Sequence, residues 1–391
     1  MLGQMSLVYL DNAATTPLDP EVREAMLPWL GGANFGNPSS RHHLGVQAAE
    51  VLTQARSRVA AALGARPGDV TFTSGGTEAN NLAILGGARA RAAHGKHVVL
   101  GPSEHSCVVR AVEQLASEGF EIERAQLSSS GALDLDHLGT ILRPDTVLVA
   151  QMLANNEVGS VYPVRHVTRL VRSRSPHAMV HVDAVQAFGK LELSMIALGV
   201  DTLSISSHKI NGPQGMGALA RTEGTVLKPL LVGGGQEGGL RSGTENVAGC
   251  VGFGLAAQLA AERQPELHRR ASELRERLVQ GVASLPGVHV LEPGAAEAPL
   301  LPTIVALQID GPPSEVMMHH LEAREVILSA GSACQSKKKE VSPSLTAIGL
   351  SPDEARRVLR FSFGWTTTVD EVDRALEALG AVVQELASAR S

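Results

Sequence analysis

Three segments that read as buried strands each run directly into residues that can do chemistry. TLSIS ends in Ser206 and continues through His208 and Lys209, MVHV continues into Asp183, and VTFT continues into a glycine-rich loop. A lysine at the end of a buried strand is desolvated, which favours the neutral amine that forms imines with aldehydes. Such a lysine can also extend its charge to solvent. The sequence therefore leaves two interpretations of Lys209 open, a nucleophile or a solvated surface charge.

The glycine-rich loop SGGTEANN at 74–81 precedes a helix with apolar periodicity. The helix dipole and the amides of Gly76 and Thr77 would then face an anion such as phosphate. The loop matches neither the GK[ST] phosphate loop nor the G-x-G-x-x-G fingerprint, and an ordinary helix start is its alternative interpretation, as a helix cap is for Asp183. Together, an anion site, a strand-end acid and a strand-end lysine match what pyridoxal 5′-phosphate requires: a phosphate cradle, a partner for the pyridinium nitrogen and an imine-forming amine.

Five further polar residues can reach a bound ring or a substrate. His105 follows HVVL and can stack over a planar ring or carry protons near neutral pH. Asn156 can donate to a ring oxygen, Gln186 lies one turn beyond the strand-end acid, Thr244 can present donors to phosphate, and Arg360 can bind a substrate carboxylate with two hydrogen bonds. Their structural alternatives are a core histidine, a turn-forming asparagine, a threonine helix cap and a surface ion pair for the arginine.

The segment SAGSACQSKKKE at 329–340 surrounds Cys334 with the smallest side chains. Such a loop can expose a thiol, and the lysines after it favour the thiolate, whereas a packing cysteine usually lies among large apolar residues. An incidental cysteine in a flexible loop is the alternative. We interpret Cys107 and Cys250 as packing residues. Three separated cysteines without a C-x-x-C pair predict neither a disulfide framework nor a zinc site, and we expect no metal.

The elements that must position these residues predict an α/β fold. Between residues 70 and 220, short β-rich runs alternate with helical stretches, which indicates a mostly parallel sheet covered by helices, with ligands at the carboxyl ends of the strands. A long Ala- and Leu-rich helical region then leads into a smaller α+β domain. We expect residues 1–20 to form an N-terminal arm of the small domain, 21–260 the large cofactor-binding domain, and 261–391 the small domain that carries the cysteine loop.

Composition excludes several classes of function. The chain has 391 residues, 43% of them hydrophobic, and no apolar run of the roughly 20 residues that a membrane span needs. The net charge of -6 and the 3% aromatic content argue against nucleic-acid binding. The first residues, MLGQMSLVYLD, read as neither a secretory leader nor a transit peptide, so we expect a cytoplasmic protein without membrane contacts.

The motifs, taken in order, resemble those of the cysteine desulfurases of the NifS and IscS type, in the class V aminotransferase branch of the fold-type I pyridoxal-phosphate enzymes. They run from YLDNAATTP through FTSGGTEANN, PSEHS, NNEVG, HVDAVQ, SSHKINGPQG, GGGQEGGLRSGT and SAGSAC to LRFSFG and cover nearly the whole chain. The resemblance implies a homodimer with a shared active site and a cofactor held on Lys209. It also implies a sulfurtransferase that takes sulfur from L-cysteine, leaves L-alanine, and carries a persulfide on Cys334 to an acceptor such as an iron-sulfur scaffold or a thiolation enzyme.

The resemblance also implies a role for each matching residue. Lys209 and His105 would be catalytic together with Cys334, Arg360 would bind the substrate carboxylate, and Asn156 would contact both substrate and cofactor. The remaining residues would hold the cofactor: Gly76, Thr77, Ser206 and His208 at the phosphate with Thr244 of the partner subunit, Asp183 at the ring nitrogen, and Gln186 with Asn156 at the phenolic oxygen.

Other activities fit many of the same residues. A selenocysteine lyase or a class V aminotransferase would use most of the cofactor ligands, but transamination does not need Cys334. A catalytically inactive sulfur carrier or assembly scaffold would not need Lys209, His105 and Asp183. The loop after Cys334 reads QSKKKEV, which departs from the family pattern and leaves the choice of sulfur acceptor open.

Overall fold

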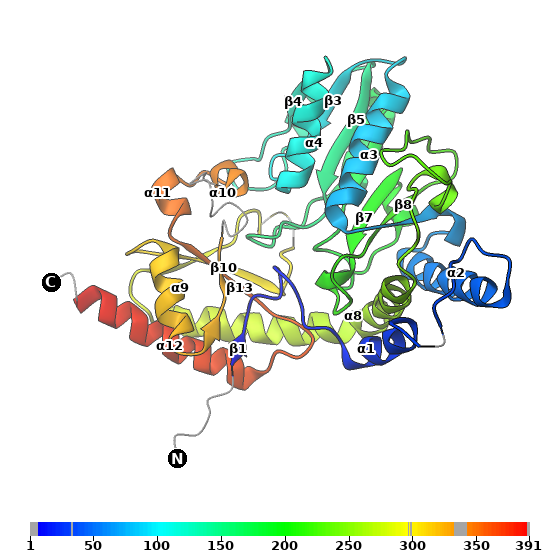
Figure 1. Cartoon of the computed structure of the whole chain (residues 1–391). Helices are drawn as coiled ribbons and strands as arrows, with labels where there is room; N and C mark the ends of the chain where they lie inside the picture. Colours follow the sequence, from blue (N-terminus) through cyan, green and yellow to red (C-terminus); the bar gives the residue numbers. More distant parts are fainter. Residues whose placement is uncertain (1–6, 33, 296, 298, 332–341, 389–391) are drawn as a thin grey trace.

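A seven-stranded sheet forms the centre of the computed structural model, which describes residues 7–32, 34–295, 297, 299–331 and 342–388. The sheet is mostly parallel, and one strand, β8, runs antiparallel to both of its neighbours (Figure 1). The predicted α/β fold is confirmed. In spatial order the strands are β2 (Val70–Thr73), β8 (Gly217–Arg221), β7 (Thr202–Ser206), β6 (Met179–Asp183), β5 (Thr146–Met152), β3 (His97–Leu100) and β4 (Glu121–Arg124).

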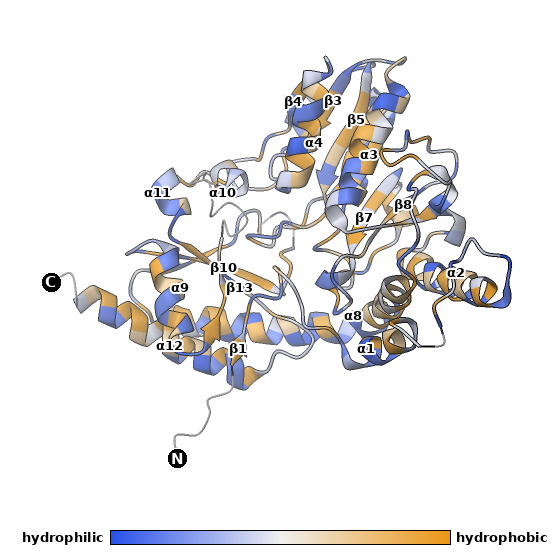
Figure 2. Cartoon of the chain, viewed as in Figure 1, coloured by the Kyte–Doolittle hydropathy of each residue, from blue (hydrophilic) through white to orange (hydrophobic). Residues whose placement is uncertain are grey.

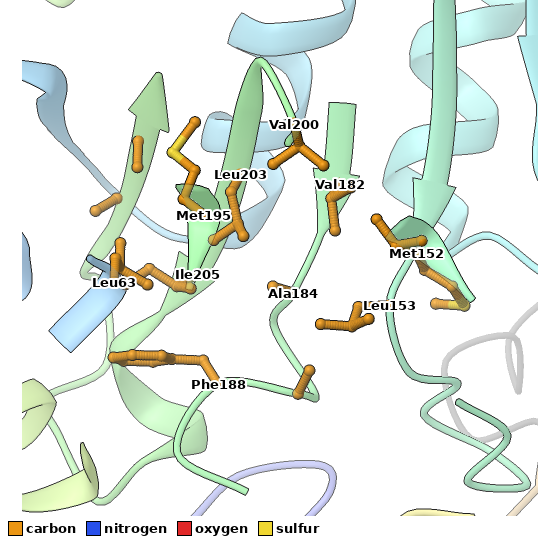
Figure 3. Packing of buried hydrophobic residues seen from close by; sticks show 14 of the residues in the cluster. Leu63, Met152, Leu153, Val182, Ala184, Phe188, Met195, Val200, Leu203 and Ile205 are labelled. Carbon is orange, nitrogen blue, oxygen red and sulfur yellow. The ribbon is translucent and has the colours of Figure 1, made fainter. Parts of the chain in front are cut away.

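Helices cover both faces of the central strands. Successive side chains of a strand point to opposite faces, so neighbouring residues pack into different apolar clusters. Val98 and Leu148 pack into one apolar cluster with α3 and α4, whereas Val99 and Val149 pack into another with α2, α6 and the first part of α8. Figure 3 shows part of the second cluster, where Phe188 lies beneath the ends of β6 and β7. The covering helices are α2 (His43–Leu63), α3 (Gly76–Arg91), α4 (Ser106–Ser117), α5 (Leu135–Ile141), α6 (Val164–Arg174), α7 (Met195–Leu198) and α8 (Val247–Val282).

A second, four-stranded antiparallel sheet packs on the far half of α8. Its order is β12-β13-β10-β9, and α9 and α12 share its apolar cluster. Figure 2 shows hydrophobic and hydrophilic residues alternating along α12, as expected of a helix with one buried face. The elements are β9 (Val288–Leu291), β10 (Ile304–Ile309), α9 (Ser314–Glu322), β11 (Val326–Ile327), β12 (Ser329–Ala330), α10 (Pro343–Ala347), α11 (Pro352–Ala355), β13 (Val358–Ser362) and α12 (Val369–Ser388).

The N-terminal segment belongs to the packing of this second unit. Strand β1 (Val8–Tyr9) pairs with β11, and Val8 and Leu10 lie in the same apolar cluster as the four-stranded sheet. The chain then crosses to the large unit and enters α1 (Pro20–Met26), which packs against α8. The division into an arm, a large domain and a small domain stays a proposal, and these contacts support it.

The reversed strand β8 sets the spacing at the carboxyl edge of the sheet. Its first residue, Gly217, pairs with Thr73 on one side and Ser206 on the other. A Cβ atom at Gly217 would lie 2.4 Å from the carbonyl carbon of Gly75, so the loop before α3 can fold over β8 because this position has no side chain.

We predict that Gly217→Ala lowers the free energy of unfolding by about 1–3 kcal/mol, the usual cost of forcing extra atoms into a packed site. Urea unfolding of the variant measures this loss. The matched control is Gly68→Ala, at an exposed glycine where a Cβ would meet nothing within 4 Å. Equal stabilities of the two variants would contradict the close packing of Gly75 on Gly217.

Candidate active site

The carboxyl ends of the central strands gather most of the residues that the sequence singles out. Asp183 is the last residue of β6 and Ser206 the last of β7, and His105 follows β3 as the N-cap of α4. Lys209 ends a 3-10 turn, Ser207–Lys209, directly after β7. Parallel strands present these ends at one edge of the sheet, so residues about 100 positions apart in the chain become neighbours.

A cavity of about 390 Å³ lies at this edge beside the start of α3. Gly76 lies close to β7, since a Cβ there would come within 2.8 Å of Val185 Cγ2 and 3.6 Å of Ser206 Cβ. Gly76 and Thr77, the first residues of a 16-residue helix, line this cavity, and the first backbone N–H groups of a helix have no partner within the helix. This arrangement suits a phosphate group. The cavity is lined by Thr15, Ser74, Gly75, Gly76, Thr77, Glu78, Ser206, His208, Gln214, Gly215 and Met216.

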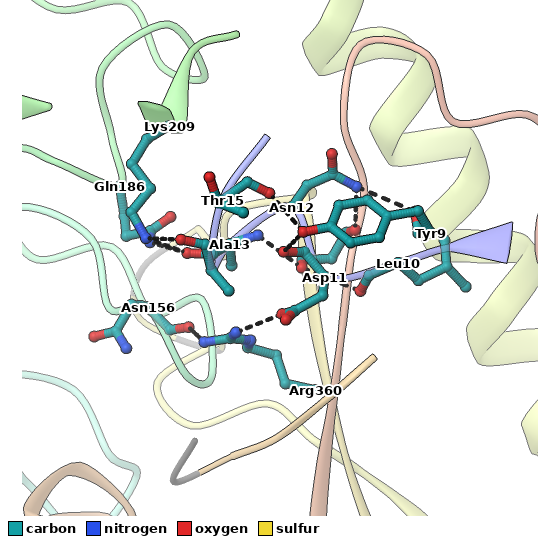
Figure 4. A network of polar contacts seen from close by, with 12 residues as sticks. Tyr9, Leu10, Asp11, Asn12, Ala13, Thr15, Asn156, Gln186, Lys209 and Arg360 are labelled. Atoms are coloured by element: carbon teal, nitrogen blue, oxygen red, sulfur yellow. Dashed lines mark hydrogen bonds and ion pairs between the residues drawn. The ribbon is translucent and has the colours of Figure 1, made fainter. Parts of the chain in front are cut away.

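The N-terminal segment holds Lys209 through backbone oxygens. Lys209 Nζ donates to the carbonyl of Ala13 at 2.6 Å and to that of Ala14 at 2.7 Å. Gln186 Nε2 donates to the same Ala13 carbonyl at 2.8 Å. Figure 4 shows the side chains of Lys209 and Gln186 pointing together at this segment. The amine is thus directed at the N-terminal segment by two acceptors, which disagrees with the solvated surface charge that the sequence left open for Lys209.

A buried lysine that the sequence pattern did not reveal, Lys190, lies next to Gln186. Lys190 Nζ donates to Gln186 Oε1 at 2.8 Å, so the amide of Gln186 is fixed at both its oxygen and its nitrogen. Burial, followed by the positive charges of Lys209 and Arg360, lowers the pKa of Lys190 to about 7. The sequence shows only that Lys190 follows Gln186 by four positions, which does not by itself indicate that the lysine is buried.

His208 faces the same segment from the phosphate side. Its Nδ1 lies 3.1 Å from Thr15 Oγ1, and its backbone carbonyl accepts from Thr16. Burial, followed by the charges of Lys209 and Lys190, lowers the pKa of His208 to about 4. The ring is therefore neutral at physiological pH and offers hydrogen bonds rather than charge.

Asp183 is oriented by a buried network that the sequence analysis did not identify. Its Oδ2 accepts from Asn80 Nδ2 at 2.8 Å, and its Oδ1 accepts from the backbone N–H of Val185 at 2.9 Å. Asn80 Oδ1 in turn accepts from Ser204 Oγ at 2.5 Å and lies 2.9 Å from His181 Nε2. Burial lowers the pKa of His181 to about 3, so this histidine is neutral. The alternative of a helix cap does not hold for Asp183, because turns follow it and the next helix, α7, begins at Met195.

His105 has close contacts with a cysteine. Its Nδ1 lies 3.0 Å from Cys107 Sγ and accepts from the backbone N–H of Cys107 at 3.3 Å. Burial lowers the pKa of His105; the charge of Asp183 acts in the opposite direction and that of Lys209 in the same direction. These electrostatic contacts place His105, Asp183 and Lys209 in one site. Cys107 does pack against the apolar cluster of α3 and α4, as predicted, but its sulfur also belongs to this site.

The residue before His105 is a buried acid. Glu104 Oε1 accepts from the backbone N–H of Met152 at 2.5 Å, and Oε2 is a buried atom without a hydrogen-bond partner among the described residues. Burial, with a smaller contribution from Asp183, raises the pKa of Glu104 to about 8. This carboxyl group is therefore largely protonated at neutral pH.

Arg360 closes the site from β13. One guanidinium nitrogen donates to Asp11 Oδ1 at 2.8 Å and another to the backbone carbonyl of Asn156 at 2.9 Å, while the side chain of Asn156 points away from it (Figure 4). Arg360 is 3% exposed, so the predicted ion pair exists but is buried rather than on the surface. Its Nε has no partner within the described part of the chain, and it can donate to an added carboxylate.

Two predicted residues are not part of this group. Thr244 does not line the phosphate cavity of its own chain; it lies beside a separate cavity of about 160 Å³ with Glu237, Arg241 and Cys250. Its predicted cap role is wrong, because Asn246 caps α8. Cys334 lies outside the described residues.

Within the described ranges, no cluster of three or more His, Cys, Asp or Glu side chains could hold a metal ion. None of the helices in those ranges has the length and hydrophobicity to cross a bilayer.

Comparisons with known proteins agree over nearly the whole chain. Residues 8–375 match the family model for the class-V aminotransferases. The chain is 39% identical to cysteine desulfurase IscS 1 of Archaeoglobus fulgidus over 97% of its own length and 98% of that protein. It is 40% identical to a cysteine desulfurase of a Nostoc species, over 98% and 94%.

Solved structures of similar fold also match nearly the whole chain. A NifS-like protein matches with a TM-score of 0.91 at 34% identity, over 97% of this chain and 100% of that one. SspA in complex with cysteine matches with a TM-score of 0.79 at 33% identity, over 91% and 98%.

We predict that Asn80→Ala destabilises the protein by about 1–3 kcal/mol, because it leaves buried donors of Ser204 and His181 without an acceptor. Chemical unfolding measures the loss. Asn81→Ala is the matched control, since Asn81 Nδ2 donates only to the Thr77 carbonyl one turn away on an exposed part of α3. If the two variants unfold at the same denaturant concentration, the network does not hold Asp183 as described.

Proposed function

The chain belongs to the cysteine desulfurases of the class-V aminotransferase family, and on this premise we propose that it removes sulfur from L-cysteine to leave L-alanine. The observation that carries the proposal is the joint position of Lys209, Asp183 and the amides of Gly76 and Thr77 at one edge of the sheet. An amine, an acid and an anion site close together are the three requirements of pyridoxal 5′-phosphate.

The residues present fit this cofactor. The cavity of about 390 Å³ that Gly76, Thr77 and Ser206 line at the start of α3 suits its phosphate. Asp183 would pair with the ring nitrogen, Gln186 and Asn156 would contact the phenolic oxygen, and His105 would stack on the ring. When bound, the cofactor supplies an electron-withdrawing ring that stabilises negative charge at the substrate carbons.

The protein's own groups would perform the remaining tasks. Lys209 Nζ would move the substrate α-proton, and the carbonyls of Ala13 and Ala14 keep that nitrogen in place beforehand. His105 would carry a second proton through its ring. Arg360 would hold the substrate carboxylate with Nε, whose hydrogen has no other acceptor within the described residues.

Cys334 would receive the sulfur. In this step the Cys334 thiolate forms an S–S bond with the substrate sulfur while the carbon–sulfur bond breaks, and the electron pair of that bond stays on the carbon side, where protonation gives alanine. The product on the protein is a persulfide. We propose further that it passes to an acceptor protein, an iron-sulfur scaffold or a thiolation enzyme, and that the enzyme works in the cytoplasm.

We also propose a homodimer in which Thr244 of the partner subunit completes the phosphate site. The position of the chain's own Thr244, exposed and outside the phosphate cavity, supports this assignment.

We predict that Cys334→Ala keeps the absorbance of bound cofactor but releases no sulfide from L-cysteine in the presence of a thiol reductant, because the sulfur has no acceptor. Lys209→Ala should lose both sulfide release and the absorbance of cofactor linked to the lysine. Cys250→Ala, which removes a buried thiol away from the site, should keep both properties. Sulfide release by Cys334→Ala at the wild-type rate would refute the nucleophile assignment.

We predict that Arg360→Lys raises the KM for L-cysteine by about tenfold or more, since lysine cannot reproduce the planar donor geometry of a guanidinium. Steady-state kinetics measures the change. The control is Arg356→Lys, at an exposed residue whose recorded ion pair is with Asp353 on the same turn. A KM equal to that of the control would remove Arg360 from substrate binding.

A further inference from the structure

We propose that Cys107 is a positioning residue that fixes the proton of His105 on Nε2 by donating its own thiol hydrogen to Nδ1. The proposal rests on the proposed function, in which His105 carries a proton. It differs from the roles of the other thiols: Cys334 would react, and Cys250 lies buried in the apolar core beneath the large sheet.

The orientation of the Asn80 amide determines the direction of the hydrogen bonds around Cys107. Ser204 Oγ donates to Asn80 Oδ1 at 2.5 Å, and His181 Nε2 approaches the same oxygen at 2.9 Å. This fixes the oxygen end of the Asn80 amide. The nitrogen end then faces Asp183 Oδ2 at 2.8 Å, which accepts one hydrogen.

The second hydrogen of the same amide reaches the cysteine. Asn80 Nδ2 lies 3.3 Å from Cys107 Sγ. Because an amide nitrogen can only donate, the sulfur accepts here. The side chain of Thr77 is also a hydrogen-bond partner of this sulfur, and its hydroxyl can donate to it. The thiol hydrogen then goes to His105 Nδ1 at 3.0 Å, because that nitrogen already accepts from the backbone N–H of Cys107 and so carries no hydrogen of its own.

The backbone supports the same direction. His105 is the N-cap of α4, and its Nδ1 accepts from the N–H of Cys107 at 3.3 Å. A proton on Nδ1 would point at this N–H and at the thiol. The ring nitrogen thus receives two donors, and Nε2 becomes the nitrogen that carries the proton.

The protonation state of the sulfur agrees with a donor role. Burial, followed by the negative charge of Asp183, raises the pKa of Cys107 to about 12. A thiol that stays protonated at neutral pH is a poor nucleophile, so Cys107 donates a hydrogen bond where Cys334 would react.

The consequence concerns the pH at which His105 gains a second proton. That proton would have to enter at Nδ1 and displace two donors, so the neutral ring persists to lower pH. The charged groups that face this ring are Asp183 from β6, which favours protonation, and Lys209 from the turn after β7, which opposes it. Glu104, on the other side of the cysteine, is largely protonated at neutral pH.

The test compares Cys107→Ala with Cys107→Ser in the cofactor-loaded enzyme, with Cys250→Ala as the control for loss of a thiol. Nitrogen-15 NMR of histidine-labelled protein reads the state of both ring nitrogens of His105 against pH, with the signal assigned through its loss in His105→Gln. We expect Cys107→Ala to raise the midpoint of ring protonation by about half a pH unit, roughly threefold in proton concentration. The acid limb of kcat/KM should move by the same amount.

Cys107→Ser keeps a donor and should stay within about 0.2 pH unit of wild type, as should Cys250→Ala. An unchanged midpoint in Cys107→Ala, or wild-type Nδ1 carrying the proton at neutral pH, would overturn the proposal. A serine variant that shifts as far as the alanine variant would also overturn it. The NMR readout does not need sulfur release, so an enzyme that turns out not to be a desulfurase still gives a result for Cys107.

Discussion

The short N-terminal segment between β1 and α1 is the element on which the arrangement of the site depends. The carbonyls of Ala13 and Ala14 accept from Lys209, Asp11 accepts from Arg360, and Thr16 binds the backbone around His208. Two cations that belong to different sheets are thus held by one stretch of backbone. The guanidinium of Arg360 is buried and would be strongly destabilised without such acceptors. The same contacts tie the four-stranded sheet to the edge of the seven-stranded one.

Burial decides which groups at this edge carry charge. It lowers the pKa of His181, His208 and Lys190 and raises that of Glu104, and in each case burial is the largest cause. The neutral forms of the two histidines and the protonated form of Glu104 then serve as hydrogen-bond partners, because an uncharged polar group costs less to bury than an ion. Asp183 accepts from both Asn80 and a backbone amide, so each of its oxygens has a donor.

The sequence predicted the sheet well because its core strands are short, apolar and separated by helices. The edge strand β4 does not stand out as an apolar run, since its sequence EIER is charged and its side chains are partly or fully exposed. Strand-end residues such as Asp183 and Lys209 could be found because parallel topology alone brings them together. Asn80, Cys107 and Lys190 could not, because each acquires its role from a contact that the chain pattern does not encode. In the sequence, Asn80 has no feature that separates it from other helix residues. Its role comes from Asp183, His181 and Ser204, which β6 and β7 place around it.

The cysteine next to His105 illustrates why such contacts have chemical consequences. A histidine that caps a helix already accepts a backbone N–H at Nδ1, which is a structural role. The same bond selects the tautomer, so capping the helix and preparing the ring for proton transfer are one interaction. Cys107 strengthens that selection and connects it through Asn80 to the carboxylate of Asp183. The acid that would pair with the cofactor ring and the histidine that would stack on it are therefore oriented by a single buried amide. A change at that amide should alter both together, whereas changes at Lys190 and Gln186 should act on the opposite side of the site.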